Sequence, residues 1–310
     1  MSLMRQTLLW CSENRWMRTH VPRLWFVRRA VKRFMPGESV DDALGEAAVL
    51  NGGGIGGILT QLGENLADTA DAVAVVAHYQ GVIDTIASRA LDAVVSVKPT
   101  QLGLDHDVET AYRNLAAIVD VAQARRNVVW VDMEQSSYVD ATLDVVQRIR
   151  DSYDNIGVCL QAYLRRTADD MGPLLERGIG VRLVKGAYAE PADVAFPTKR
   201  DVDANYLALA ERLLESPAPA GHLRPAFATH DPVMVQRIRD TAGARGVGPE
   251  RYQFQMLYGI QRQLQNTLVR EGHGVMVLIS YGEAWYPWYL RRLAERPANV
   301  WFVAKSMVKG

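Results

Sequence analysis

Charged and polar side chains follow short apolar runs at six places along the chain. Any one of them is most often satisfied within the structure, because charges are rarely buried without a partner. Six consecutive runs with this pattern are hard to attribute to packing alone, so we expect these side chains to converge on one site. The polar ends are Glu64, Lys98, Asp132 with Glu134, Gln161, Arg182 with Lys185, and Thr229 with His230.

A pair of arginines near the C-terminus could bind an anion. Trp288, Arg291, Arg292 and Glu295 lie three or four residues apart, so in a helix they share one side. The planar guanidinium suits two-point binding of a carboxylate. A surface helix with an Arg291–Glu295 ion pair explains the same residues, and without further context it is the preferred interpretation.

Short apolar runs alternate with amphipathic segments of helical length from about residue 50 onward. Such runs suit strands buried on both faces. Strand alternating with helix implies parallel pairing, and eight repeats favour a closed, TIM-like (βα)8 barrel over an open sheet, which stays an alternative. The predicted strands are Ile58–Leu62, Ala93–Lys98, Val128–Met133, Ile156–Tyr163, Gly180–Val184, Ala226–Thr229, Gln253–Leu257 and Gly274–Ser280.

Two helix starts carry recognisable signals. Asp231 before Pro232 predicts an N-cap followed by proline in the first helical position. Thr167, with Asp170 three residues later, predicts a capping box.

Residues 1–50 stand outside the alternation and are predicted to form a helical arm, while residues 51–310 form the barrel domain. Between Met1 and Pro36 the arm has eight basic residues and one acidic residue, together with three tryptophans. Such a segment could make peripheral contact with an anionic membrane. The preferred interpretation is an amphipathic arm that packs on the bottom or side of the domain.

The composition favours a soluble globular protein. Of 310 residues, 48% are hydrophobic and 23% charged, and no apolar run approaches the roughly 20 residues that span a bilayer. A formal net charge of zero gives no reason to expect a nucleic-acid partner. Two cysteines give no disulfide framework, which favours a reducing cytoplasm. The scattered histidines form no metal-binding motif, so no metal site is expected.

Seven short motifs occur in order between residues 62 and 299. They are LGENL near Glu64, VSVKPTQLGL around Lys98, VDMEQ around Asp132, VRLVKGAY from Val181, ATHD from Ala228, FQMLYGI from Phe254 and YLRRLAERPAN from Tyr289. Each is weak alone, but their ordered combination is specific. The chain thereby resembles the proline dehydrogenase family.

The resemblance implies a distorted (βα)8 barrel whose eighth helix lies over the barrel top. It also implies oxidation of L-proline to Δ1-pyrroline-5-carboxylate by hydride transfer to N5 of FAD, with the electrons passed to a quinone. The implied partners are therefore a small cyclic amino acid and a quinone.

The resemblance assigns roles to residues around the substrate. Arg291 and Arg292 would bind its carboxylate together with Lys98, and Asp132 would orient or neutralise Lys98. Glu64 would face the two arginines and could gate the entrance as an ion pair. The side chains around the substrate ring would be Tyr188, Leu257, Leu278 and Trp288.

The resemblance also implies a cofactor site. Arg182 would stabilise the negative charge that a reduced flavin carries near N1, and Arg182 and Asp132 are the predicted catalytic residues. The FAD pyrophosphate requires lysine or backbone N–H donors. The implied cofactor contacts are Met133, Gln161, Arg182, Lys185, Gly186, Ala187, Thr229 and His230.

Two positions depart from the family pattern. The family usually has tyrosine where this chain has Leu278 and again where it has Trp288. Leu278 removes a hydroxyl from the wall beside the substrate ring, and a related subgroup that acts on hydroxyproline also lacks that tyrosine. Hydroxyproline or another substituted cyclic amino acid is therefore an alternative substrate.

Three other classes of protein stay open. Gly52–Gly57 matches the G-x-G-x-x-G pattern of nicotinamide dehydrogenases, but it precedes a predicted strand instead of following one, so a turn is preferred. Lys98 or Lys185 on a barrel strand could form a Schiff base, as in a lyase. A barrel that has lost its activity and serves as a binding protein is the third.

Overall fold

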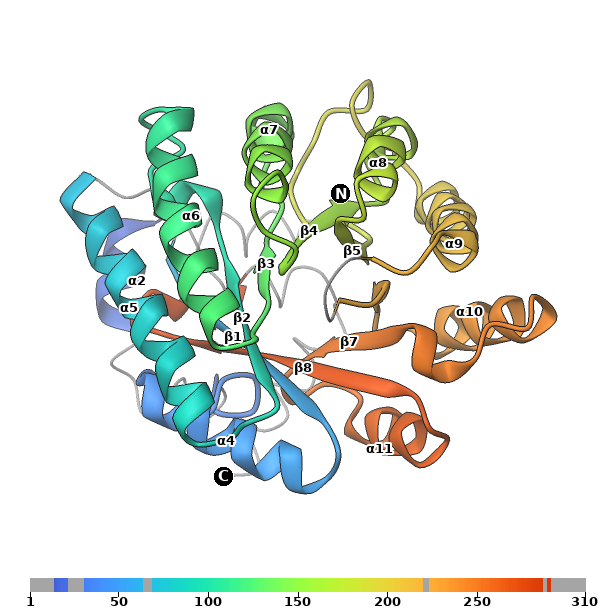
Figure 1. Cartoon of the computed structure of the whole chain (residues 1–310), viewed down its shortest axis with the longest axis horizontal. Helices are drawn as coiled ribbons and strands as arrows, with labels where there is room; N and C mark the ends of the chain where they lie inside the picture. The colour runs from blue at the N-terminus through green and yellow to red at the C-terminus, as the bar shows by residue number, and fades with distance from the viewer. Residues whose placement is uncertain (1–13, 22–30, 64–68, 220–222, 287–288, 291–310) are drawn as a thin grey trace.

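The computed structural model describes residues 14–21, 31–63, 69–219, 223–286 and 289–290. Within these ranges, eight strands pair in chain order into a closed parallel barrel (Figure 1), which confirms the predicted fold class. The ladder between the first and last strands closes the barrel. The strands are β1 (Gly56–Gln61), β2 (Ala93–Val97), β3 (Val129–Val131), β4 (Ile156–Gln161), β5 (Gly180–Val184), β6 (Ala226–Ala228), β7 (Gln253–Leu257) and β8 (Gly274–Tyr281).

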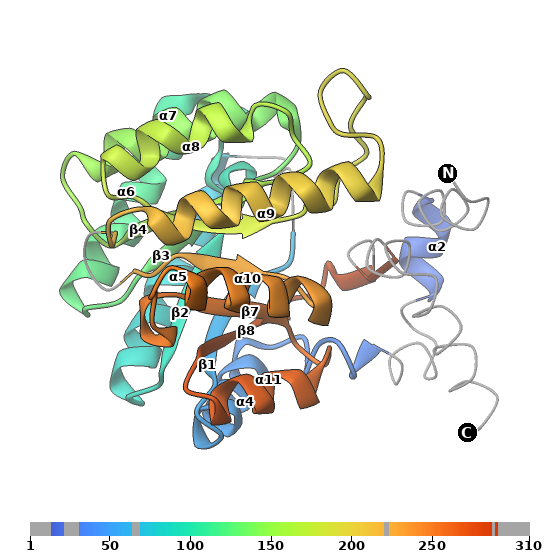
Figure 2. The same cartoon turned by 90° about the vertical axis from the view of Figure 1, so that its right-hand side faces the viewer.

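Helices follow each of the first seven strands and surround the barrel (Figures 1 and 2). None of the described helices is long and apolar enough to cross a bilayer. The predicted eighth helix begins with helical backbone at residues 285–286 and 289–290, and the rest of it lies outside the described residues. The helices are α2 (Arg15–His20), α4 (Val40–Gly52), α5 (Thr69–Ser88), α6 (Val108–Ala124), α7 (Val139–Arg150), α8 (Thr167–Glu176), α9 (Lys199–Glu215), α10 (Pro232–Ala244) and α11 (Arg262–Arg270), with short 3₁₀ turns η2 (Pro99–Leu102), η3 (Ser136–Tyr138) and η4 (Pro249–Arg251).

The two faces of the barrel strands carry different chemistry. Side chains alternate along a strand, so Val95 and Val97 of β2 pack outward into the main core beneath the helices, whereas Ser96 between them faces the barrel interior. Trp130 lies beside Ser96 in the ladder and fills the interior; a Cβ on Gly157 would come within 2.6 Å of its ring. The interior is therefore closed by Trp130 and becomes polar toward the strand ends.

The segment from residue 31 to residue 38 lies at the C-terminal ends of the strands, and not on the bottom or side of the domain as predicted for the arm. The carbonyl of Glu38 accepts a hydrogen bond from the backbone of Gly282, directly after β8. Phe34 packs with Trp285 and Tyr289 in a small apolar cluster that α2 also contacts (Figure 2). The amphipathic segment finds its apolar partners beyond the strand ends because the barrel side at β1 and β8 is already covered by α4.

The predicted boundary at residue 50 falls within α4. Ala43, Leu44 and Ala47 of this helix belong to the main core, and α4 packs against β1 and β8. Residues 40–50 thus share a core with the barrel. The division of the chain into an arm and a barrel domain stays a prediction.

Of the two helix starts predicted from the sequence, the structure confirms one and contradicts the other. Asp231 caps α10 by accepting from the backbone of Val233, as predicted. The capping box at Thr167 is wrong: its hydroxyl donates to the carbonyl of Gln161 at 2.6 Å, and Arg166 occupies the cap position. Gly52–Gly57 forms the turn from α4 into β1, where Gly54 has a φ of 74°.

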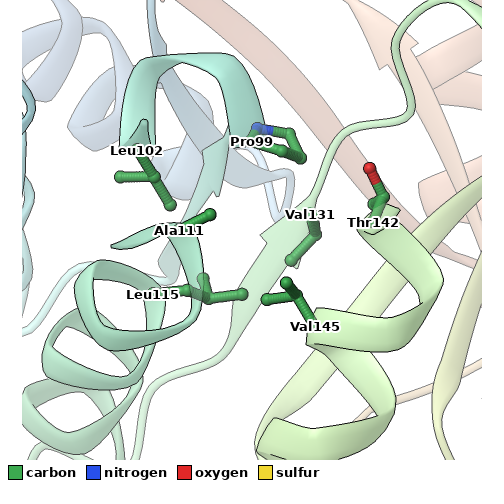
Figure 3. Close-up of a pocket in the computed structure, with 7 residues that line it drawn as sticks. All are labelled: Pro99, Leu102, Ala111, Leu115, Val131, Thr142 and Val145. Atoms are coloured by element: carbon green, nitrogen blue, oxygen red, sulfur yellow. The ribbon is translucent and has the colours of Figure 1, made fainter. Parts of the chain in front are cut away.

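A small cavity lies between α6, α7 and the end of β3 (Figure 3). Its volume is about 10 Å³, barely enough for one water molecule. Thr142 lines it, and the hydroxyl of this buried residue has no hydrogen-bond partner. The other lining residues are Pro99, Leu102, Ala111, Leu115, Val131 and Val145.

Replacing Thr142 with valine is expected to raise the free energy of unfolding by about 1 kcal/mol, because it removes a desolvated hydroxyl and keeps the shape. The matched control is Thr167→Val, which removes a buried hydroxyl that does have a partner, the Gln161 carbonyl. That variant is expected to lose stability. Urea denaturation of both variants checks the prediction, and destabilisation by Thr142→Val would contradict it.

Candidate active site

Three charged side chains meet at the C-terminal end of the barrel. Asp132, directly after β3, accepts a hydrogen bond from the guanidinium of Arg182 on β5. The ammonium of Lys98, directly after β2, lies 3.6 Å from the other carboxylate oxygen. Ser96 completes the cluster: its hydroxyl donates to Asp132 at 2.8 Å and accepts from Arg182 at 2.9 Å. The structure thus brings together three residues that the sequence placed on separate strands.

Strand alternation explains how Arg182 reaches Asp132. Arg182 is on β5 and Asp132 directly follows β3, and Cys159 on the intervening β4 lies beside Arg182 in the ladder. Because cysteine is short, the guanidinium can extend across β4. It lies 5.3 Å from the centre of the Trp130 ring, so the tryptophan that closes the interior also supports the cation.

The electrostatics of the cluster favour an ionised carboxylate. Burial alone would raise the pKa of Asp132, but the positive charges of Arg182 and Lys98 and the Ser96 hydrogen bond outweigh it and hold the pKa below its usual value. Arg182 is only 3% exposed. Two cations therefore share one anion at this site, which leaves an excess positive charge that can bind an anionic substrate group.

A second charged cluster lies beyond β5 and β6. Lys185 donates to Asp203 at 2.5 Å and lies 3.5 Å from Asp231. Lys199 also binds Asp203. Burial would raise the pKa of Asp203, but the hydrogen bonds from both lysines lower it below its usual value. An open hollow of about 420 Å³ adjoins this cluster and is lined by Lys199, Arg200, Asp203, Ala204 and Arg237.

Gln161 and Gly186, two of the predicted cofactor residues, lie at the ends of β4 and β5. The side-chain oxygen of Gln161 is buried and has no hydrogen-bond partner, while its nitrogen donates to the carbonyl of Met133 at 3.4 Å. Gly186 has a φ of 111°, and a Cβ there would come within 2.1 Å of the Tyr163 ring. An unpartnered acceptor for a ligand thus lies at the end of β4, whereas Gly186 is required because the backbone after β5 packs against the Tyr163 ring more closely than a side chain would allow.

The remaining predicted cofactor residues lie near the same strand ends. His230 accepts from the backbone N–H of Leu257 at 2.8 Å through Nε2, which places the imidazole proton on Nδ1. The hydroxyl of Thr229 accepts from the backbone of Asp231 at 3.2 Å. Met133 packs its side chain into the main core, and its carbonyl accepts the hydrogen bond from Gln161. Ala187 is exposed in the segment after β5.

An apolar wall stands on the opposite side of the barrel mouth. Leu278 of β8 lies between Leu257 of β7 and Ile58 of β1 in the ladders. Leu257, at the end of β7, and Leu278, within β8, are half-buried. Tyr188 is half-buried in the segment after β5. The three side chains form an aliphatic row, and the hydroxyls of Thr60 and Ser280 follow as the next inward-facing pair toward the strand ends.

The arginine clamp is predicted in residues that the structure does not describe. Glu64, Trp288, Arg291 and Arg292 all lie outside the described residues. The chain just before the arginines is held in place: Trp285 donates to the Glu38 carboxylate at 2.9 Å. Tyr289 and Leu290 are buried in the small apolar cluster with Phe34. The described residues 285–286 and 289–290 therefore pack at the same end of the barrel as Lys98.

Sequence reasoning missed several residues of these clusters. Ser96 carries no motif of its own, but its position two residues before Lys98 places it on the same strand face, and this alternation could have revealed it. Asp203 and Lys199 belong to α9, and only the fold brings them to Lys185. Nothing in the local sequence indicates that pairing.

A closed (βα)8 barrel with buried opposite charges at its strand ends defines an enzyme of the TIM-barrel class. Comparison with known proteins specifies the family. A family model described as "Proline dehydrogenase" matches residues 43–305. The chain is 36% identical over 309 residues to Proline dehydrogenase 2 of Bacillus subtilis subsp. natto, covering 100% of both chains. It is 34% identical over 284 residues to Proline dehydrogenase of Deinococcus radiodurans, covering 90% of each.

The solved structures agree in fold. Proline utilization A from Bdellovibrio bacteriovorus, inactivated by N-propargylglycine, superimposes with a TM-score of 0.81 at 24% identity. The match covers 94% of this chain and 36% of that larger one, so this chain spans about a third of its length. From the family model and the relatives, the chain belongs to the proline dehydrogenase family and is an oxidoreductase.

Replacing Asp132 with asparagine is expected to lower the free energy of unfolding by about 3–5 kcal/mol, because it leaves the buried Arg182 cation without its counter-charge. The matched control is Asp140→Asn, which breaks an ion pair to Arg166 in which the aspartate side chain is 83% exposed. The control is expected to lose far less stability. Urea denaturation compares the two, and equal losses would contradict the burial argument.

Proposed function

We propose that this protein oxidises L-proline to Δ1-pyrroline-5-carboxylate with FAD as its cofactor and a quinone as the final electron acceptor. The observation that carries the proposal is the cluster of Lys98, Asp132 and Arg182 at the strand ends of a barrel of this family. The cluster offers the positive charge of Lys98 to a carboxylate, and the buried Arg182 cation lies on the other side of Asp132. Bound FAD would supply the two-electron acceptor that amino-acid side chains lack.

The residues at the strand ends fit FAD. The buried, unpartnered oxygen of Gln161 can accept from the N–H of the flavin ring, and Arg182 can stabilise negative charge on that ring. Gly186 and Ala187 would bring backbone close to the cofactor. Lys185 would contribute positive charge near the pyrophosphate. We also assign Met133, through its carbonyl, and Thr229 and His230, which follow β6, to this site.

The substrate would lie between the cationic cluster and the apolar wall. Lys98, with Arg291 and Arg292 from the undescribed segment, would bind its carboxylate, and Asp132 would keep Lys98 in place. Glu64 would close the entrance opposite the arginines. Oxidation removes a hydride from the ring carbon beside nitrogen and a proton from the nitrogen, so the amine must be neutral. Nearby cations favour that state by lowering the amine pKa.

A second candidate substrate class is a substituted cyclic amino acid, hydroxyproline included. The observation that favours a substituted ring is the row of Ile58, Leu278 and Leu257, which has no hydroxyl. Together with Tyr188 and Trp288 it would form the surface around the ring. Within this class an aliphatic row favours an apolar ring substituent over the hydroxyl of hydroxyproline, because a polar group against it would lose hydrogen bonds to water.

The quinone and the N-terminal arm suggest where the protein works. We assign it to the cytoplasm, with peripheral contact to the membrane in which a quinone dissolves. Trp16 of α2 is 65% exposed and its ring stacks on His20. The basic residues up to Arg33 supply the charge that anionic lipids attract.

Anaerobic reduction of the bound flavin tests the function. L-Proline is expected to bleach the flavin absorbance of the purified protein, and the panel includes trans-4-hydroxy-L-proline, pipecolate and N-substituted prolines. Leu278→Tyr, which returns a hydroxyl to the wall, is expected to favour proline over substituted rings.

A colourless protein trapped by borohydride with a keto substrate would instead indicate a Schiff-base lyase. Retained flavin that no cyclic amino acid reduces would indicate a binding protein.

A further inference from the structure

Glu134 is a buried carboxylate that binds the chain after β2. It is 3% exposed and lies two residues beyond Asp132. Both of its oxygens accept hydrogen bonds from Thr100, one from the backbone N–H at 2.9 Å and one from the hydroxyl at 2.8 Å. Thr100 in turn lies two residues beyond Lys98. The chain after β3 therefore binds the chain after β2 at two points, Asp132 to Lys98 and Glu134 to Thr100.

The backbone pairing between these strands ends just before the two contacts. The last ladder pair joins Val97 and Val131, and the backbone N–H of Asp132 donates to the carbonyl of Val97 at 2.8 Å. Beyond that bond the chain enters the turn η2, which begins with Pro99 and so lacks one backbone donor. Hydrogen bonds from Thr100 to the Glu134 carboxylate continue the pairing where the backbone ladder cannot.

The turn is held on other sides as well. Gln101 donates to the carbonyls of Gln61 and Gly63, at the end of β1, at 3.1 and 2.9 Å. Asn114 of α6 donates to the carbonyl of Leu102 at 2.9 Å. Among these contacts, Glu134 is the one that joins the turn to the strand carrying Asp132. Removing the Glu134 side chain would leave the distance between Lys98 and Asp132 less constrained, while the contacts of the turn to β1 and α6 would stay.

We propose that Glu134 is a positioning residue, which fixes the turn carrying Lys98 and so holds the Lys98 ammonium where the substrate carboxylate binds. The inference rests on the proposed function, in which Lys98 binds that carboxylate. A carboxylate suits the task because it accepts from an amide and a hydroxyl at once. Glutamine can also do both, with its oxygen facing the amide and its nitrogen donating to the hydroxyl.

Steady-state kinetics with L-proline test the proposal. Glu134→Ala is expected to raise KM by about tenfold or more, the effect of weakening one charge-assisted hydrogen bond to the carboxylate. Its kcat is expected to fall much less. Glu134→Gln is expected to restore KM to near the wild-type value. Thr100→Val, which removes only the hydroxyl contact, is a milder variant for use where Glu134→Ala folds poorly, and it should raise KM in the same direction.

Two further variants separate positioning from general loss of structure. Asn114→Ala loosens the same turn on its α6 side, so it should lower the melting temperature and leave KM unchanged. Lys98→Met should raise KM, and adding Glu134→Ala to it should raise KM no further, because Glu134 acts through Lys98.

The outcomes distinguish the two proposals. If Lys98→Met raises KM but Glu134→Ala and Thr100→Val leave it unchanged, or if the effects of Glu134→Ala and Lys98→Met multiply, Glu134 does not position Lys98. The same conclusion follows if Asn114→Ala raises KM as much as Glu134→Ala. If Lys98→Met keeps the wild-type KM, the substrate contact in the proposed function is wrong, and the role of Glu134 is overturned with it.

Discussion

The candidate site depends on one buried cation, Arg182, inside the barrel. An arginine that is 3% exposed can stay there only if its charge is balanced and its donors are bonded. Asp132 supplies the charge and Ser96 an acceptor, and both positions follow from strand alternation on neighbouring elements. Asp132 also lies 3.6 Å from Lys98. Because Asp132 balances Arg182 and also contacts Lys98, it determines where the Lys98 ammonium lies. The position of that ammonium in turn determines the direction from which a carboxylate would be bound.

The other parts of the site are arranged around this cluster. Cys159 and Gly157 on β4 are small, so Arg182 can cross that strand and Trp130 can close the interior below it. On the far side of the barrel, Ile58, Leu278 and Leu257 form an aliphatic row, which separates a region for the charged end of a substrate from a region for its ring. The N-terminal segment packs through Phe34 and Glu38 against the chain that leads to Arg291. The barrel strands thus carry the charged cluster and the aliphatic row. Residues 31–38 and the described residues 285–286 and 289–290, which are distant in sequence, pack together beyond the strand ends.

Much of the fold could be predicted from the sequence because a (βα)8 barrel repeats one pattern. The bounds of β5 and β7 were predicted in full, whereas β3 is shorter than predicted because ladder pairing ends at Val131, before the chain reaches Asp132. Residues at strand ends, such as Lys98 and Asp132, could be found in the same way. Contacts made by helices and by the arm could not. The capping box at Thr167 fails because a carbonyl of β4 competes for its hydroxyl, and the position of residues 31–38 depends on an apolar cluster with residues 285–290 that no local pattern encodes.

We propose that Arg182 places a fixed positive charge beside a bound flavin, and the midpoint potential of that flavin tests this role most directly. In Arg182→Met, Asp132 keeps Lys98 as its partner, so the variant loses the cation without stranding the carboxylate. The reduced flavin, which carries negative charge, would then be less stabilised, and the midpoint potential should become more negative. Arg182→Lys retains the charge and should stay near the wild-type value. An Arg182→Met protein with full flavin occupancy and an unchanged midpoint potential would contradict the account.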